Sequence, residues 1–138
     1  MRNQVPTLSL AIAAAFAMSS PGHSADDWSF IAGKYALEPD DCKLVAKGQP
    51  FSKGLFNEIS SEVMTREGIT SPREVHCKFR SSKRDTGSDA KWTVKADCEE
   101  MGDPSPYELE VTTNSDGSIV VTSEDVYGPP LTFVKCPQ

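Results

Sequence analysis

Histidine and long hydrophobic runs are both scarce in this chain of 138 residues. Only His76 follows residues 1–24, so a histidine-based metal site or a Ser-His catalytic pair has little to work with. The longest apolar run, residues 8–18, has 11 residues, whereas a membrane-spanning helix needs about 20. No Cys-x-x-Cys motif occurs, which argues against the common dithiol redox and zinc-binding motifs.

The amino-terminal residues have the pattern of an export signal. Arg2 precedes the apolar run, and the small-residue stretch 19–25 follows it. We expect a signal peptide at residues 1–24, with cleavage after Ser24 or Ala25, and a single β domain at residues 25–138. No cysteine ends the apolar run, so no lipid or membrane anchor is expected. These features predict a bacterial protein that is periplasmic or secreted.

The chain after the signal segment has fewer basic than acidic residues. Without Arg2, 13 Lys and Arg remain against 20 Asp and Glu, a formal net charge of −7. An acidic surface repels nucleic acid and anionic lipid, so neither is an expected partner. A domain of this size has a modest core, and cross-links would supply much of its stability.

Four cysteines follow the signal segment, at Cys42, Cys77, Cys98 and Cys136. In an oxidising compartment they are sufficient for two disulfides, and their wide spacing favours a structural role over a redox or metal-binding one. If residues 81–90 form a hairpin loop, Cys77 lies opposite Val94, and a Cys77 to Cys98 bond needs a shifted register or a bulge. Two other pairings remain open. One joins Cys42 to Cys77 and Cys98 to Cys136, and the crossed one joins Cys42 to Cys98 and Cys77 to Cys136.

Alternation of apolar and polar residues indicates strands with one face toward the core. The pattern occurs in residues 75–80, 92–98, 107–112, 118–123 and 131–136, and residues 28–37 are expected to supply the first strand. Asp116-Gly117 between two such segments predicts a hairpin turn. The fold class expected is all-β, a small antiparallel β-barrel or sandwich of six to eight strands stapled by two disulfides.

Residues 51–68 fit two patterns. Phe56, Ile59 and Val63 lie at helical spacing, but residues 59–65 also alternate as a strand would. Because the rest of the chain is a meander and Gly68 ends the run, we favour a strand, or a helical turn followed by a strand.

Four groups of polar residues could carry chemistry. Asp85-Thr86-Gly87 matches the triplet of aspartic proteases, but the polar residues before it favour a solvated hairpin loop. The acidic stretches 40–41, 99–103 and 114–118 could bind calcium, although the full loop pattern is missing and solvated turns are favoured. We therefore expect neither catalysis nor a metal ion, and no cofactor.

The loop of residues 86–92, Thr-Gly-Ser-Asp-Ala-Lys-Trp, offers a functional lead. It resembles the Ser-Gly-Ser-Gly-Ala-Lys-Tyr loop of bacterial inhibitors of c-type lysozyme, which are small secreted or lipid-anchored β-barrel proteins. In that family the loop enters the substrate cleft of the enzyme, where polar and basic groups meet the catalytic carboxylates. The resemblance implies a lysozyme partner, with Ser88 and Lys91 as contacts. Asp89 stands where the family has glycine, and the family's later lysine-glycine segment has no clear counterpart.

These observations favour an exported, non-catalytic binding protein. Its expected partner is a protein, with a cationic hydrolase such as c-type lysozyme as the specific hypothesis, because a negative charge steers the chain toward a cationic enzyme. One alternative is a carrier of a small lipophilic ligand, since the aromatic residues could line a barrel. The other alternative is an accessory subunit of a cell-envelope complex.

Overall fold

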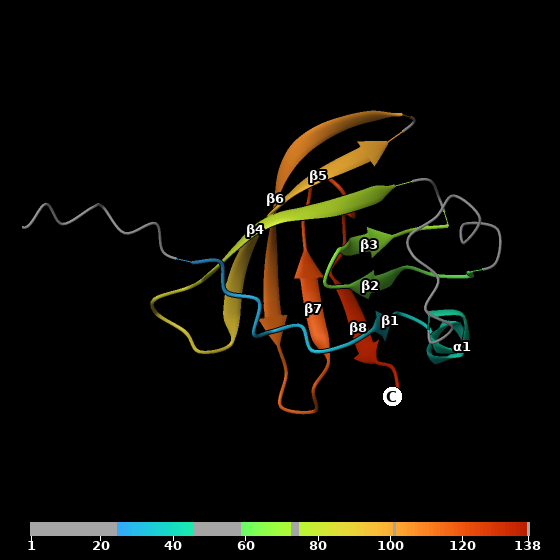
Figure 1. Cartoon of the computed structure of the whole chain (residues 1–138), viewed down its shortest axis with the longest axis horizontal. Helices are drawn as coiled ribbons and strands as arrows, with labels where there is room; N and C mark the ends of the chain where they lie inside the picture. Colours follow the sequence, from blue (N-terminus) through green and yellow to red (C-terminus); the bar gives the residue numbers. More distant parts are fainter. Residues whose placement is uncertain (1–24, 46–58, 73–74, 101, 138) are drawn as a thin grey trace, which may run out of the picture.

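Eight antiparallel strands follow one another along the chain and close into a barrel, in which β1 pairs with β8 (Figure 1). The computed structural model describes residues 25–45, 59–72, 75–100 and 102–137. Its elements are β1 Tyr35–Ala36, η1 Pro39–Asp41, α1 Cys42–Val45, β2 Val63–Thr65, β3 Gly68–Thr70, β4 His76–Arg84, β5 Lys91–Glu100, β6 Asp103–Thr113, β7 Ile119–Thr122 and β8 Leu131–Lys135. The predicted all-β barrel is confirmed, with eight strands.

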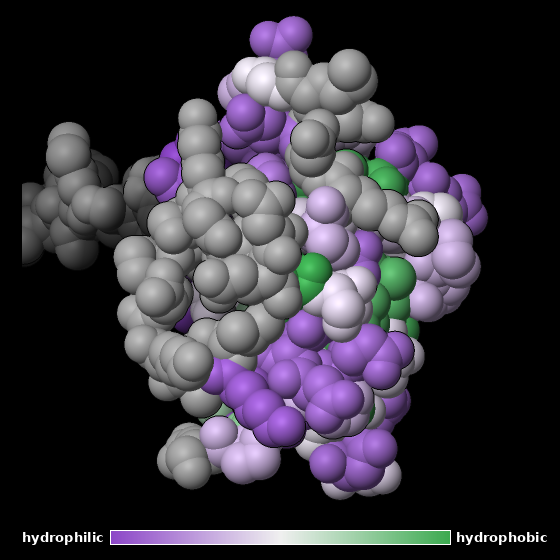
Figure 2. Space-filling view, turned by 90° about the vertical axis from the view of Figure 1, so that its right-hand side faces the viewer, coloured by the Kyte–Doolittle hydropathy of each residue, from purple (hydrophilic) through white to green (hydrophobic). Residues whose placement is uncertain are grey.

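The alternating residues of the long strands fill the barrel. Trp92, Val94, Ala96 and Cys98 of β5 are all buried, and so are Leu109 and Val111 of the neighbouring β6. Polar residues occupy the positions between them and face solvent. On the side of the molecule that Figure 2 shows, apolar residues appear only as small separate spots among hydrophilic ones. The alternation that predicted these strands therefore separates the core from the surface.

The amino-terminal part of the domain differs from its prediction. Residues 28–37 were expected to form a whole strand, but only β1, Tyr35–Ala36, pairs with its neighbours. Residues 26–31 instead lie against β4, where the amide of Asp27 donates to the carbonyl of Ser82 at 2.9 Å. Trp28 and Phe30 point their rings into the aromatic core, so this segment contributes packing rather than strand pairing.

The ambiguous segment also resolves into two strands where it is described. β2 and β3 form a hairpin in which Thr65 pairs with Gly68, and Gly68 opens β3 rather than ending a run. The predicted position of Phe56 lies outside the described residues. The hairpin at 114–117 is confirmed, because the amide of Gly117 donates to the carbonyl of Asn114 and β7 follows directly.

The disulfides join Cys42 to Cys136 and Cys77 to Cys98. The expected register of β4 and β5 was wrong, because β4 continues through the polar residues to Arg84 and leaves a loop of only residues 85–90. Ser82 turns inward opposite Val94, and a bulge between Phe79 and Ser81 then brings Cys77 opposite Cys98. The cross-link that needed a shifted register is therefore the one that forms. Two disulfides in a small domain are typical of an oxidising compartment.

A second, smaller core lies on the outer face of β1 and β2. Tyr35 and Met64 belong to the barrel interior, whereas their neighbours Ala36 and Val63 face the opposite way, as strand geometry requires. Ile59 and the Cys42–Cys136 disulfide cover these two residues. In Figure 1, α1 lies beside β1 on this side of the barrel.

Asp41 holds this outer core in place. It is 4% exposed, and its carboxylate accepts hydrogen bonds from the amide and hydroxyl groups of both Ser60 and Ser61, at 2.6–3.2 Å. Burial raises the pKa of Asp41, but these four donors outweigh it and keep the pKa below the usual value. The carboxylate was expected in a solvated turn and is instead a buried structural acceptor.

Asp41→Asn is expected to lower the free energy of unfolding at pH 7 by about 1–3 kcal/mol, because an amide nitrogen replaces one acceptor oxygen. Since the pKa of Asp41 is lowered on folding, its stabilisation is present above the unfolded-state pKa of about 3.9 and is lost as the pH falls through the folded-state value. Urea unfolding should therefore show a smaller gap between the variant and the native chain at pH 3 than at pH 7.

The exposed neighbour Asp40 provides the control for this experiment. Asp40→Asn removes one negative charge from the same turn and should change stability little. An equal loss for Asp41→Asn at both pH values would contradict the role of the Asp41 carboxylate.

Candidate functional site

The loop between β4 and β5, residues 85–90, lies at one end of the barrel (Figure 1). Asp85, Thr86, Gly87 and Asp89 are exposed, while Ser88 and Ala90 are half-buried. Asp85 therefore lies in the solvated hairpin loop that was predicted, rather than behind a buried strand. The carbonyl of Ala90 accepts from the amide of Thr113 at the end of β6, at 3.0 Å, while the exposed residues of the loop stay accessible to a partner.

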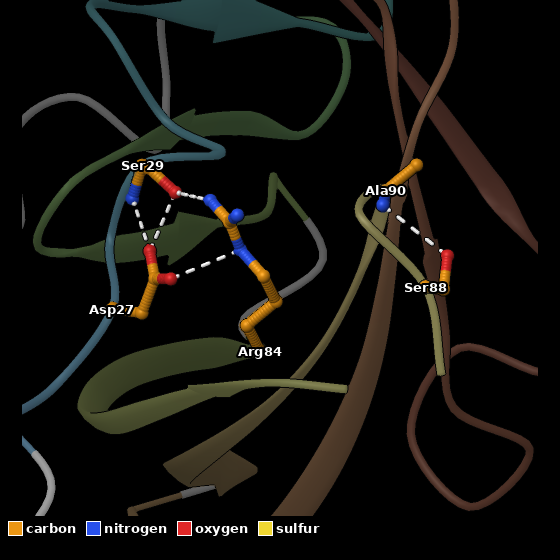
Figure 3. Close-up of polar contacts among 5 residues, drawn as sticks. All are labelled: Asp27, Ser29, Arg84, Ser88 and Ala90. Carbon is orange, nitrogen blue, oxygen red and sulfur yellow. Dashed lines mark hydrogen bonds and ion pairs between the residues drawn. The ribbon is translucent and has the colours of Figure 1, made fainter. Parts of the chain in front are cut away.

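Hydrogen bonds within the loop fix its shape. The carboxylate of Asp85 accepts from the amide of Gly87 at 3.1 Å. The hydroxyl of Ser88 accepts from the amide of Ala90 at 3.2 Å, as Figure 3 shows. At the base, the amide of Asp85 donates to the carbonyl of Lys91 at 2.8 Å. Side chains that satisfy backbone amides in this way stabilise turns, so the loop is preorganised.

The two predicted contact residues have separate partners in the structure. Ser88 uses its oxygen to accept from the amide of Ala90, and Lys91 places its Nζ 2.9 Å from Oε2 of Glu110 on β6. The hydrogen bond and the negative charge of Glu110 raise the pKa of Lys91. Both members of this ion pair remain substantially exposed, with side-chain exposures of 38% and 51%. Lys91 thus remains accessible although it is paired.

Beneath the loop, Arg84 ties the hairpin to the amino-terminal segment. Its Nε lies 3.0 Å from the carboxylate of Asp27, and its Nη2 donates to the hydroxyl of Ser29 at 2.6 Å (Figure 3). Hydrogen bonds from the side chain and the backbone of Ser29 lower the pKa of Asp27, and the charge of Arg84 has a smaller effect in the same direction. This contact joins residues 27–29 to the end of β4.

Aromatic rings and Arg84 extend the same arrangement into the barrel. Trp28 stacks on Phe79 with ring centroids 6.0 Å apart, and Phe30 meets Trp92 at 5.5 Å. The guanidinium of Arg84 lies 5.1 Å from the centroid of the Trp92 ring. The aromatic residues were expected in the core, but the sequence contained no signal that residues 28–30 would cross from the amino terminus to this end of the barrel.

The described residues contain no group of three or more His, Cys, Asp or Glu side chains placed to hold a metal ion. His76, the histidine that follows the signal segment, is half-buried on β4. In the described part of the chain, no helix is long and apolar enough to cross a membrane. Asn114 and Asp116 bind Ser118 within their own turn.

Comparison with protein-family models, with curated proteins and with solved structures finds no match to this chain.

Proposed function

We propose that the chain is an exported binding protein that inhibits a cationic hydrolase, with c-type lysozyme as the specific target. The observation that carries this proposal is the preorganised polar loop of residues 85–90, exposed at one end of a cross-linked barrel. A loop that is already ordered loses little conformational entropy when it enters a cleft. Function in the periplasm or the medium agrees with the disulfides and with the expected signal peptide.

Lys91 is the residue of this loop region suited to meet catalytic carboxylates. Its present partner, Glu110, is itself a carboxylate on a neighbouring strand, and the pair is exposed. Exposed ion pairs contribute little to stability, so Lys91 can exchange Glu110 for an enzyme carboxylate at small cost. The exposed Asp85 and Asp89 would face the cationic rim of the enzyme, where negative charge accelerates association.

The filled barrel interior favours protein binding over ligand carriage. Side chains from several strands and from residues 30–31 meet there, among them Phe133, Met64 and Leu109, each of which is 0% exposed. A carrier needs an open apolar space in this position. Native mass spectrometry of the purified chain with a stoichiometric small molecule bound would favour the carrier alternative instead.

The proposal is tested by the rate at which a c-type lysozyme clears a turbid cell-wall suspension. The mature chain should inhibit clearing at micromolar concentration, and Lys91→Ala should raise the inhibition constant about 10- to 100-fold, the effect of losing a charged hydrogen bond. The melting temperature of this variant should not change, because the Lys91 to Glu110 pair is exposed.

Two further variants sharpen the test. Lys95→Ala removes an exposed cation from the same strand and should leave inhibition unchanged. Glu110→Gln releases Lys91 from its partner and should maintain or strengthen inhibition. Unchanged clearing with the native chain would refute the proposed function, and equal effects of Lys91→Ala and Lys95→Ala would refute Lys91 as a contact.

A further inference from the structure

A cleft of about 210 Å³ opens beside the Cys77–Cys98 disulfide. It lies between the β5–β6 hairpin and the segment that joins β7 to β8. Its lining includes Val75, Cys98, Asp103, Ser105, Tyr107, Asp125 and Val126. Cys98, one of the two cysteines of this disulfide, therefore forms part of the cleft wall, although it is only 3% exposed.

The other sulfur of this disulfide has a hydrogen-bond donor. The hydroxyl of Tyr127, from the same β7–β8 segment, donates to Sγ of Cys77 at 3.2 Å. Burial, and then the negative charge of Glu62, raise the pKa of Tyr127. The phenol therefore keeps its proton at neutral and mildly alkaline pH. Among the described residues, no hydroxyl is hydrogen bonded to the sulfur atoms of the Cys42–Cys136 disulfide.

We propose that the Cys77–Cys98 disulfide is a thiol-exchange site served by this cleft. A small thiolate enters and attacks Sγ of Cys98, forming a new sulfur–sulfur bond as the Cys98–Cys77 bond breaks. Sγ of Cys77 leaves with the electron pair as a thiolate and takes its proton from water. One disulfide replaces another, so no separate oxidant or reductant is needed.

Tyr127 promotes this step by stabilising the leaving group. A thiolate that departs more easily speeds exchange, and a hydrogen bond to the developing charge on Sγ of Cys77 has that effect. The regiochemistry follows from the same geometry, because Cys98 lines the cleft while Tyr127 engages Cys77. The incoming group should therefore be found on Cys98.

The charge of the cleft selects the class of thiol. Asp103 and Asp125 are both exposed on its lining, and no cationic side chain is among the described lining residues. Their carboxylates attract a thiol that carries an ammonium group and repel one that carries an acid. The substrate class is accordingly a small cationic aminothiol rather than an anionic thiol.

The folded barrel should survive the exchange. Cys77 and Cys98 lie on neighbouring strands that pair from His76 to Arg84, and β5 also pairs along its length with β6. These pairings hold the two strands together after the cross-link opens. Exchange at this site is therefore expected in the native state, without prior unfolding.

The test exposes the intact, folded mature chain to cysteamine or to 2-mercaptoethanesulfonate, compared at equal thiolate concentration. Samples are quenched with acid, freed thiols are alkylated, and peptides are mapped by mass spectrometry. We expect the adduct on Cys98, alkylation on Cys77, and reaction several-fold faster with cysteamine. Replacing Asp103 and Asp125 by Asn should abolish that preference.

Tyr127→Phe should slow the exchange about tenfold, as expected for losing a hydrogen bond to a charged group. Tyr35→Phe is the matched control, because Tyr35 is a buried tyrosine outside the cleft lining whose hydroxyl accepts from the amide of Ala32, and it should leave the rate unchanged. The Cys42–Cys136 disulfide provides an internal reference for general unfolding.

Three results would overturn the proposal. They are exchange that occurs only in denaturant, equal reaction of both disulfides in the native chain, and adducts divided evenly between Cys77 and Cys98. A rate that Tyr127→Phe and Tyr35→Phe change equally would overturn the role of Tyr127. Melting curves of both variants distinguish slower exchange from a change in global stability.

Discussion

Gly68→Ala is expected to destabilise the barrel by about 3–5 kcal/mol, the sum of a steric overlap and a strained backbone. A Cβ atom at Gly68 would lie 1.9 Å from the carbonyl oxygen of Cys77, which is part of the backbone and cannot rotate away. The φ of Gly68 is +155°, a value that residues with side chains rarely adopt. Relief of the overlap must separate β3 from β4, where Gly68 pairs with Lys78.

Gly117→Ala is the matched control that measures the cost of the strained backbone without the steric overlap. Gly117 has a φ of +86°, but a Cβ atom there would meet nothing within 4 Å, so only the strain of about 1–2 kcal/mol is expected. Denaturant unfolding of both variants isolates the steric contribution as the difference between them. If both variants lose the same unfolding free energy, the overlap at Gly68 costs nothing and β3 can move away from β4 freely. That result would contradict tight pairing of β3 with β4 in the closed barrel.

The strands of this protein are predictable where alternation is long. β5 buries every second residue from Trp92 to Cys98, β6 buries Leu109 and Val111 in the same alternating way, and both strands were predicted from that pattern. β3 has only three residues, Gly68–Thr70, all of them buried. A segment this short has no period to detect, and its pairing with β2 and β4 exists only in the assembled barrel.

The register of β4 and β5 could not be predicted because polar residues extend β4. Ser82 is 3% exposed, although a serine in a run with Ser81, Lys83 and Arg84 indicates a loop. The bulge between Phe79 and Ser81 then moves the pairing by one residue. Tertiary packing decides both features, since residues 26–31 lie against this part of β4.

The candidate site shows the same division between local and distant contacts. Local sequence was enough to place Asp85 and Ser88 in an exposed hairpin loop. The contacts that surround the loop are long-range, because Glu110 comes from β6 and Asp27 from the amino-terminal segment. No spacing rule connects such residues, so Lys91 was predicted as a contact without its partner.

Removing the Cys42–Cys136 disulfide is expected to cost more stability than removing Cys77–Cys98. Chain-entropy estimates for separations of 94 and 21 residues differ by about 1.3 kcal/mol, and the longer cross-link contributes about 4–5 kcal/mol in total. In addition, Cys42 and Cys136 form part of the outer core that covers Ala36 and Val63. Loss of this cross-link should therefore also loosen α1 from the barrel.

Paired alanine variants make the comparison equal in packing, because all four cysteines are between 2% and 7% exposed. Denaturant unfolding of Cys42→Ala with Cys136→Ala, against Cys77→Ala with Cys98→Ala, should show the larger loss in the first pair. Strand pairing explains the smaller loss in the second, because β4 and β5 already hold Cys77 opposite Cys98 when the cross-link is absent. The reverse order would mean that the cross-strand bond, rather than the link between the ends of the domain, is the main staple of the fold.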